Sequence, residues 1–196
     1  MSRLGLLIVG VGGQGVLTVA RILGDAALQC GLEVVVGQLH GMAQRGGAVE
    51  ATVLIGSGIH SSFVERADVV LGLEPLEVLR GLPRLTPQTR VVFNNGRVVP
   101  FPLSMRGLPY PDMDGILTQI RAVTPLVTEV DGPALLKELG DARPLNTLML
   151  GALAGLDGAL PFDDLTVRRS VERQGGAARR RELNLKAYDL GRQSVR

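Results

Sequence analysis

The residues with the clearest capacity for chemistry lie in one glycine-rich turn near the start of the chain. Gly10, Gly12 and Gly15 follow the G-x-G-x-x-G spacing, with Gly13 and Gln14 inside it. Glycine permits a tight turn and lets an anion approach the backbone closely. The helical N–H groups that follow such a turn, together with the helix dipole, suit a phosphate or pyrophosphate. We therefore expect a phosphate site here, and the alternative is a tight turn that binds nothing.

An ordinary dinucleotide site would also need a carboxylate for the ribose. That carboxylate usually stands at the end of the second strand, roughly 20 residues beyond the glycines. The strand predicted over residues 33–40 ends in Gln38 and His40, and its only acid, Glu33, stands at the wrong end. An NAD site is disfavoured, so we consider another phosphate-bearing ligand or a protein partner.

A second glycine motif follows that strand. Residues 40–47 lack apolar periodicity and place Met42 and Arg45 just before Gly46 and Gly47. The Arg45 guanidinium offers a planar fork for phosphate or carboxylate, and the two glycines let a partner's backbone come close. We expect this loop to contact an anion or a partner.

One carboxylate follows a later strand. Glu74 stands between the apolar run 68–73 and Pro75, which is typical of a first helical position. Glu74 is therefore either a site residue or a carboxylate favoured by the N-terminus of a helix.

The elements that must position these residues alternate between strands and helices. Besides the apolar run before Gly10, strands are predicted over residues 33–40, 48–55, 68–73, 90–93 and 126–130, with 48–55 near a sheet edge. Helices are predicted over residues 16–31, 75–79, 112–123, 132–139, 146–156, 162–173 and 177–191. This pattern predicts an α/β fold: a Rossmann-like, open, mostly parallel sheet with helices on both faces.

Local signals add four expectations. Residues 63–67 are predicted to form a short helical connector, and the turn signal at residues 94–96 could join the strand before it to residues 98 and 99. Asn146 is expected to cap its helix. Cys30, the only cysteine, is expected to be a small buried residue.

Composition bounds the class of protein. The 196 residues are 45% hydrophobic but only 3% aromatic, so Val, Leu, Ile and Ala must build the core of what we expect to be a single domain, 1–196. No apolar run is long enough to span a bilayer and the N-terminus lacks signal-peptide features, so we expect no membrane contact and a cytoplasmic location. We expect no metal ligands, because one cysteine and two histidines are too few for a typical metal-binding site.

Charge is distributed unevenly. Residues 166–196 hold nine basic and three acidic residues, a net of +6, whereas the remainder holds twelve basic and sixteen acidic, a net of −4. The run Arg179 to Arg181 could contact nucleic acid, but no stacking aromatics or reading motif accompany it. A solvated helix face or an acidic partner subunit is the favoured interpretation.

Known cofactor motifs are missing from the sequence. Thiamine-diphosphate domains carry Gly-Asp-Gly followed by Asn-Asn, because these residues hold the bridging magnesium through oxygen ligands. The Asp-Gly pairs at 114, 131 and 157 lack the leading glycine, and Asn94-Asn95 precedes all of them. One cysteine also excludes a four-thiolate iron–sulfur cluster held by this chain alone.

Together the motifs at residues 10–15, 41–47, 72–75 and 146–147 resemble those of the gamma-type subunits of 2-oxoacid:ferredoxin oxidoreductases. The resemblance covers essentially the whole chain. Within that family the Met-Ala-Gln-Arg-Gly-Gly version preceded by His40 looks like the beta subunit of the indolepyruvate-type enzymes.

The resemblance implies oxidative decarboxylation of an arylpyruvate with coenzyme A and ferredoxin. It places thiamine diphosphate, magnesium and iron–sulfur clusters on a large alpha subunit, and it implies a homodimer or heterotetramer that acts with ferredoxin. The glycine turn would then suit the pyrophosphate of coenzyme A, or an interface. Two other classes stay open: a free-standing nucleotide-binding oxidoreductase, and a regulatory or nucleic-acid-binding module that uses the basic tail.

Overall fold

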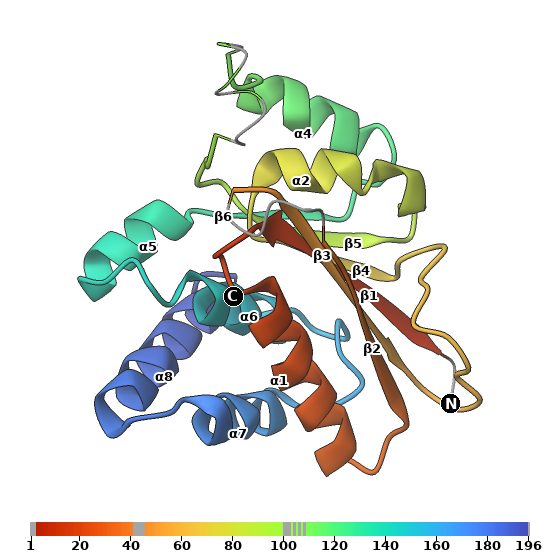
Figure 1. Cartoon of the computed structure of the whole chain (residues 1–196), viewed down its shortest axis with the longest axis vertical. Coiled ribbons are helices and arrows are strands. Elements are labelled where there is room, and N and C mark those ends of the chain that lie inside the picture. Colours follow the sequence, from red (N-terminus) through yellow and green to blue (C-terminus); the bar gives the residue numbers. More distant parts are fainter. Residues whose placement is uncertain are drawn as a thin grey trace.

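A six-stranded sheet organises the chain in the computed structural model (Figure 1). The structure describes residues 3–40, 46–99, 103, 105, 107 and 109–195, and of His40 only the backbone. Met42 and Arg45 therefore lie outside the described residues. The strands are β1 (Leu4–Val11), β2 (Val34–His40), β3 (Ala48–Ile55), β4 (Val69–Gly72), β5 (Arg90–Asn94) and β6 (Val127–Val130).

The helices follow the predicted order. They are α1 (Val16–Gln29), α2 (Pro75–Arg80), α4 (Met113–Arg121), α5 (Gly132–Leu139), α6 (Leu145–Gly155), α7 (Asp164–Gln174) and α8 (Ala178–Gln193), with a short 3-10 turn at Leu82–Arg84. In the described part of the chain, no helix is both long and apolar enough to cross a bilayer.

The strand order is β2-β3-β1-β4-β5-β6. β1 pairs in parallel with β4, and β4-β5 and β5-β6 are also parallel, as the apolar runs predicted. β3 lies antiparallel to both β1 and β2, so it separates the first strand from the second. β2 and β6 form the two edges of the sheet, and β3 lies next to the edge strand β2, near an edge as predicted.

Helices cover both faces of the sheet, which confirms the predicted architecture (Figure 1). One face packs on α1, α6, α7 and α8, and alternate β1 residues such as Leu6 and Ile8 point into that core. The other face packs on α2 and α4, and receives Leu7 and Val9. Side chains alternate across a strand and helices cover both faces of the sheet, so β1 is buried on both sides.

Two local predictions fail because tertiary contacts override them. Residues 63–67 form no helix: residues 65 and 66 form a bend and the others have no regular structure, Val64 is buried, and the neighbouring Ser62 carbonyl accepts a 2.7 Å hydrogen bond from Thr52 Oγ1. Residues 95–99 form no strand, because β5 already has β4 on one side and β6 on the other. Asn94 instead turns the chain locally by accepting from the Gly96 N–H at 3.1 Å.

Two residue-level predictions are also wrong. Asn146 lies within α6, whose N-cap residue is Pro144, so it does not cap the helix. Cys30 is exposed, because it follows the last turn of α1 beyond the buried Ala27. Its thiol is therefore no part of the core.

Candidate functional site

The fold brings the two glycine motifs together. The Gly12 N–H donates to the Gly47 carbonyl at 2.8 Å, and the Gly46 N–H donates to the Gly12 carbonyl at 3.5 Å. The turn after β1 is thus hydrogen-bonded to the segment that enters β3. Since the Gly12 N–H is occupied in this way, any anion must bind elsewhere on the turn.

Gln14 fills the inside of the turn. Its Oε1 accepts from the Val11 N–H at 2.7 Å, and its Nε2 donates to the Leu73 carbonyl at 3.0 Å. A Cβ at Gly10 would stand 2.9 Å from that Oε1, so the glycine makes room for the side chain. Gln14 therefore joins the end of β1 to the end of β4.

The last two glycines of the turn have different surroundings. Gly15 has φ +87°, and a Cβ there would lie 2.5 Å from Asn146 Nδ2, so Asn146 packs directly on the turn. Gly13 has φ +105°, and no atom of the described residues lies within 4 Å of its Cβ position. The Gly13 side of the turn is therefore the one that a ligand can approach.

The start of α1 supplies further N–H groups directly after the turn. Its first intrahelical bond runs from Val19 N–H to the Gly15 carbonyl at 3.1 Å, and Gly15, the N-cap residue, has no side chain to accept from the earlier N–H groups. α6 and α8 likewise begin without a side-chain cap, at Pro144 and Ala177. Uncapped helix starts carry partial positive charge.

All three helix starts line one cleft of about 1240 Å³. Gly13, Gln14 and Thr18 form one wall, the α5–α6 connection and the start of α6 another, and the first turns of α8 the third. Sequence reasoning found the first wall only. The basic run of α8 was interpreted there as a solvated face or a partner contact, because spacing along the chain gives no sign that α8 packs on α6 and α7 and lines this cleft.

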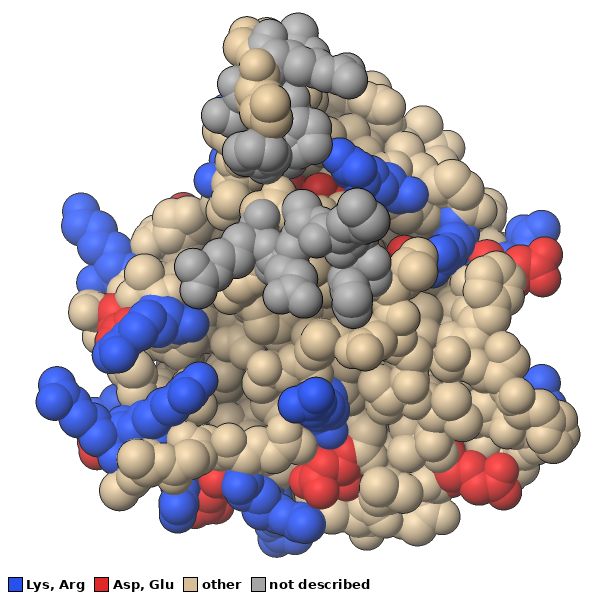
Figure 2. Space-filling model, in the orientation of Figure 1, with Lys and Arg blue, Asp and Glu red and all other residues tan. Residues whose placement is uncertain are grey.

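Four basic side chains line the cleft. Arg143 pairs with Asp141, and the Arg143 guanidinium lowers the pKa of that carboxyl to about 2. Lys186 pairs with Glu182 at 2.8 Å. The remaining two, Arg179 and Arg180, form no ion pair with any described residue. Figure 2 shows Lys and Arg gathered over α5 and α8.

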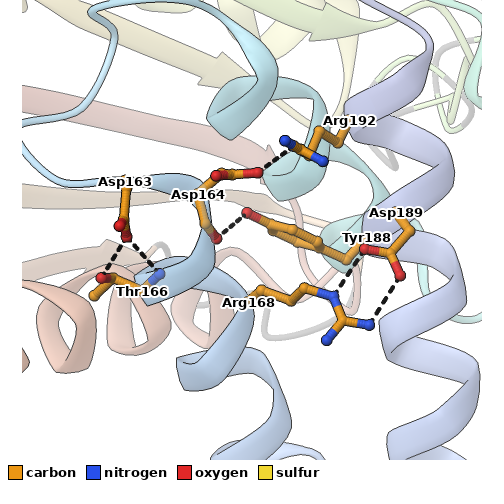
Figure 3. Close-up of polar contacts among 7 residues, drawn as sticks. All are labelled: Asp163, Asp164, Thr166, Arg168, Tyr188, Asp189 and Arg192. Carbon is orange, nitrogen blue, oxygen red and sulfur yellow. Dashed lines mark hydrogen bonds and ion pairs between the residues drawn. The ribbon is translucent and has the colours of Figure 1, made fainter.

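A polar joint between α7 and α8 holds the third wall in place (Figure 3). Arg168 makes a two-pronged contact with Asp189, at 2.9 and 3.0 Å, and Arg192 pairs with Asp164. The buried Tyr188 hydroxyl donates to the Asp164 carbonyl at 2.9 Å. Paired charges with matched geometry fix the two helices relative to each other.

Glu74 caps α2. Its side chain is fully buried, its Oε2 accepts from the Glu77 N–H at 3.1 Å, and its Oε1 accepts from the Tyr110 hydroxyl. Glu74 is not among the residues that line the cleft. The sequence allowed Glu74 to be a site residue or a carboxylate at the N-terminus of a helix, and the geometry shows it at the N-terminus of α2.

Glu77, one turn later, is a buried carboxyl that the sequence did not single out. Its side chain is 3% exposed and its Oε1 has no hydrogen-bond partner among the described residues. Burial raises the pKa of Glu77 to about 7. The positive charge of Arg80 lowers this pKa, and the negative charge of Glu74 raises it.

The shifted pKa predicts a pH dependence of stability. Between pH 4.5 and 7 the folded chain keeps a proton that the unfolded chain releases, so the free energy of unfolding falls as pH rises through that window. We expect Glu77→Gln to abolish this fall and to exceed the wild type at pH 8 by up to roughly 3 kcal/mol. Urea unfolding of both proteins at pH 5 and pH 8 measures it, and parallel pH profiles would contradict it.

Comparisons with known proteins agree with the fold and the motifs. The chain matches the family model of pyruvate ferredoxin/flavodoxin oxidoreductases over residues 5–194. It is 37% identical to an indolepyruvate oxidoreductase subunit, IorB, of Archaeoglobus fulgidus, covering 96% of this chain and 94% of that protein. The corresponding subunit of Methanothermobacter thermautotrophicus is 34% identical, with 95% and 94% covered.

Solved structures share the fold. The gamma subunit of keto/oxoacid ferredoxin oxidoreductase from Geobacter sulfurreducens has a TM-score of 0.74 at 21% identity, with 100% of this chain and 97% of that one covered. A 2-oxoglutarate:ferredoxin oxidoreductase from Magnetococcus marinus, solved with 2-oxoglutarate, coenzyme A and succinyl-CoA, has a TM-score of 0.77 at 19% identity, with 100% and 31% covered. Our chain belongs to the pyruvate ferredoxin/flavodoxin oxidoreductase family.

Proposed function

We propose that this chain is the small, gamma-type subunit of a 2-oxoacid:ferredoxin oxidoreductase that acts on indolepyruvate or a related arylpyruvate. The observation that carries the proposal is the near full-length identity of 37% to an indolepyruvate oxidoreductase subunit. The reaction is a coenzyme A-dependent oxidative decarboxylation that yields an aryl-acetyl-CoA, carbon dioxide and reduced ferredoxin.

Thiamine diphosphate, magnesium and iron–sulfur clusters belong, in this proposal, to a large partner subunit. The chain has a single cysteine, and the described residues include no group of three His, Cys, Asp or Glu side chains placed to hold a metal ion. When bound, the partner's thiamine diphosphate supplies the decarboxylation chemistry. The small subunit contributes binding surfaces. The active enzyme is a complex of both subunits, such as a heterotetramer.

The surface that we assign to coenzyme A is the open side of the glycine turn. Among the described residues Gly13 leaves room for a phosphate to approach the backbone, and the N–H groups at the start of α1, which no N-cap side chain occupies, follow directly. Gln14 keeps the turn in shape, and Asn146 backs it. The glycines at 46 and 47 join the turn to β3, and with Arg45 they form the proposed contact to the partner.

The proposal predicts that the purified chain is inactive and colourless by itself. Co-expression with a large subunit that carries thiamine and four-cysteine motifs should give arylpyruvate-dependent reduction of a viologen dye. The measurement compares the chain, the large subunit and the complex, each with indolepyruvate, pyruvate and 2-oxoglutarate. Turnover by the chain alone would refute the subunit assignment, and a preference for pyruvate or 2-oxoglutarate would refute the arylpyruvate specificity.

A further inference from the structure

The basic side chains of the cleft are not equivalent. The Asp141–Arg143 and Glu182–Lys186 pairs compensate their own charges, whereas Arg179 and Arg180 have no carboxylate partner among the described residues. Both stand in the first turn of α8, which begins without a side-chain cap. The excess positive charge of the cleft is therefore concentrated at the start of α8, across the cleft from the glycine turn.

The cleft is large enough for the start of α8 and the glycine turn to be two separate binding positions. Ligand pockets are commonly about 300–1,000 Å³, and this cleft measures about 1240 Å³ with the turn and the start of α8 on different walls. One phosphate group cannot occupy both places. A ligand that fills the cleft must carry anionic groups at two separated positions.

Each position favours phosphate. Among the described residues nothing fills the space where a Gly13 side chain would stand, which lets a compact anion reach backbone N–H groups. Arg179 and Arg180 both line the cleft, so each guanidinium can donate N–H groups to a phosphate monoester, which carries nearly two negative charges at pH 7. Asp141 and Glu182 are each paired with another cation, Arg143 and Lys186, and Arg179 contributes only a smaller charge interaction with Asp141.

We infer that Arg179 and Arg180 form a second phosphate subsite, which recognises a phosphate monoester of the ligand whose pyrophosphate lies at the glycine turn. The inference rests on the proposed function and extends it, because coenzyme A carries a 3′-phosphate apart from its pyrophosphate. The two arginines are then specificity-determining residues. They select coenzyme A over its 3′-dephospho form without taking part in the chemistry.

The test uses coenzyme A and 3′-dephospho-coenzyme A with the assembled complex. In the wild type we expect the apparent KM for the dephospho form to be roughly 10- to 100-fold higher, as for loss of a charge-assisted contact. The double variant Arg179→Ala/Arg180→Ala should raise the KM for coenzyme A to the same level. It should leave the KM for the dephospho form and the kcat at saturation unchanged.

Arg181→Ala is the matched control. Arg181 is the next residue of the same helix, but it donates to the Gly176 carbonyl and is absent from the lining of the cleft. Calorimetric titration of both nucleotides into the purified chain gives a readout that is independent of turnover. The wild type and Arg181→Ala should bind coenzyme A more tightly than its dephospho form by the same factor as in the KM measurement. The double variant should bind the two nucleotides equally.

Three results would overturn the subsite. They are equal affinities of the wild type for the two nucleotides, an equal effect of Arg181→Ala, and an effect of the double variant on complex assembly with no change in the KM ratio. The last would assign the arginines to the partner subunit. Failure of the proposed function is seen separately, as absence of arylpyruvate turnover in the wild-type complex.

Discussion

Gly151→Ala is expected to destabilise the chain by about 3 kcal/mol, the upper end of the usual cost of overpacking, although it adds a single methyl group. A Cβ at Gly151 would lie 2.0 Å from the Tyr188 carbonyl oxygen, and one at Gly191 would lie 1.9 Å from the Leu148 carbonyl oxygen. α6 and α8 thus meet backbone to backbone. Because no side-chain rotation can relieve such a clash, the two helices must move apart.

The measurement is the free energy of unfolding in urea, with Gly115→Ala as the control. Gly115 lies inside α4, and no atom of the described residues lies within 4 Å of its Cβ position. There the same substitution should stabilise the chain by up to about 1 kcal/mol, because alanine has the higher helix propensity. Similar values for the two variants would show that the α6–α8 contact is looser than described.

Gln14→Leu is expected to cost about 1–3 kcal/mol of stability and to raise the apparent KM for coenzyme A in the complex. Leucine has a similar size but leaves the Val11 N–H without an acceptor and removes one of two donors from the Leu73 carbonyl. A buried N–H without a partner carries most of this cost. The glycine turn loses its internal brace at the same time.

Gln119→Leu is the matched control for that change. Gln119 is exposed on α4 and donates only to the Gly115 carbonyl in its own helix, so its loss should stay within about 0.5 kcal/mol. Urea unfolding and coenzyme A titration of the complex measure both effects. If Gln14→Leu matched Gln119→Leu in both, Gln14 would have no positioning role.

Much of the fold was predictable because local patterns and the final packing agree. The apolar run before Gly10 is a buried strand, Pro75 opens a helix behind Glu74, and the helix starting at residue 132 ends at Leu139 as its pattern indicates. In each case the apolar residues recur at the spacing that is typical of the helix or strand in which they lie.

The failures share a physical cause, which is competition from contacts distant in sequence. The turn signal at residues 94–96 is strong, but β6 takes the side of β5 that a hairpin strand would need. The antiparallel position of β3 between β1 and β2 likewise depends on the whole sheet, since alternation of side chains is the same for either strand direction.

The candidate site was predicted in part for the same reason. The spacing of Gly10, Gly12 and Gly15 indicated the turn, but the occupation of the Gly12 N–H by Gly47 requires the fold. That Asn146 packs on Gly15, and that α8 closes the cleft, depends on the glycine contact between α6 and α8. No local pattern in either helix identifies its neighbour.

The central place of β1 has a consequence for synthesis on the ribosome. β1 is the first strand to emerge, yet its two neighbours are β3, which ends at Ile55, and β4, which begins at Val69. The apolar residues of β1 therefore have neither partner until Ile55 has been translated, which is more than a quarter of the way along the chain. Such delayed pairing favours slow folding and transient exposure of apolar strands. We therefore expect the nascent chain to stay prone to aggregation until β4 has left the exit tunnel.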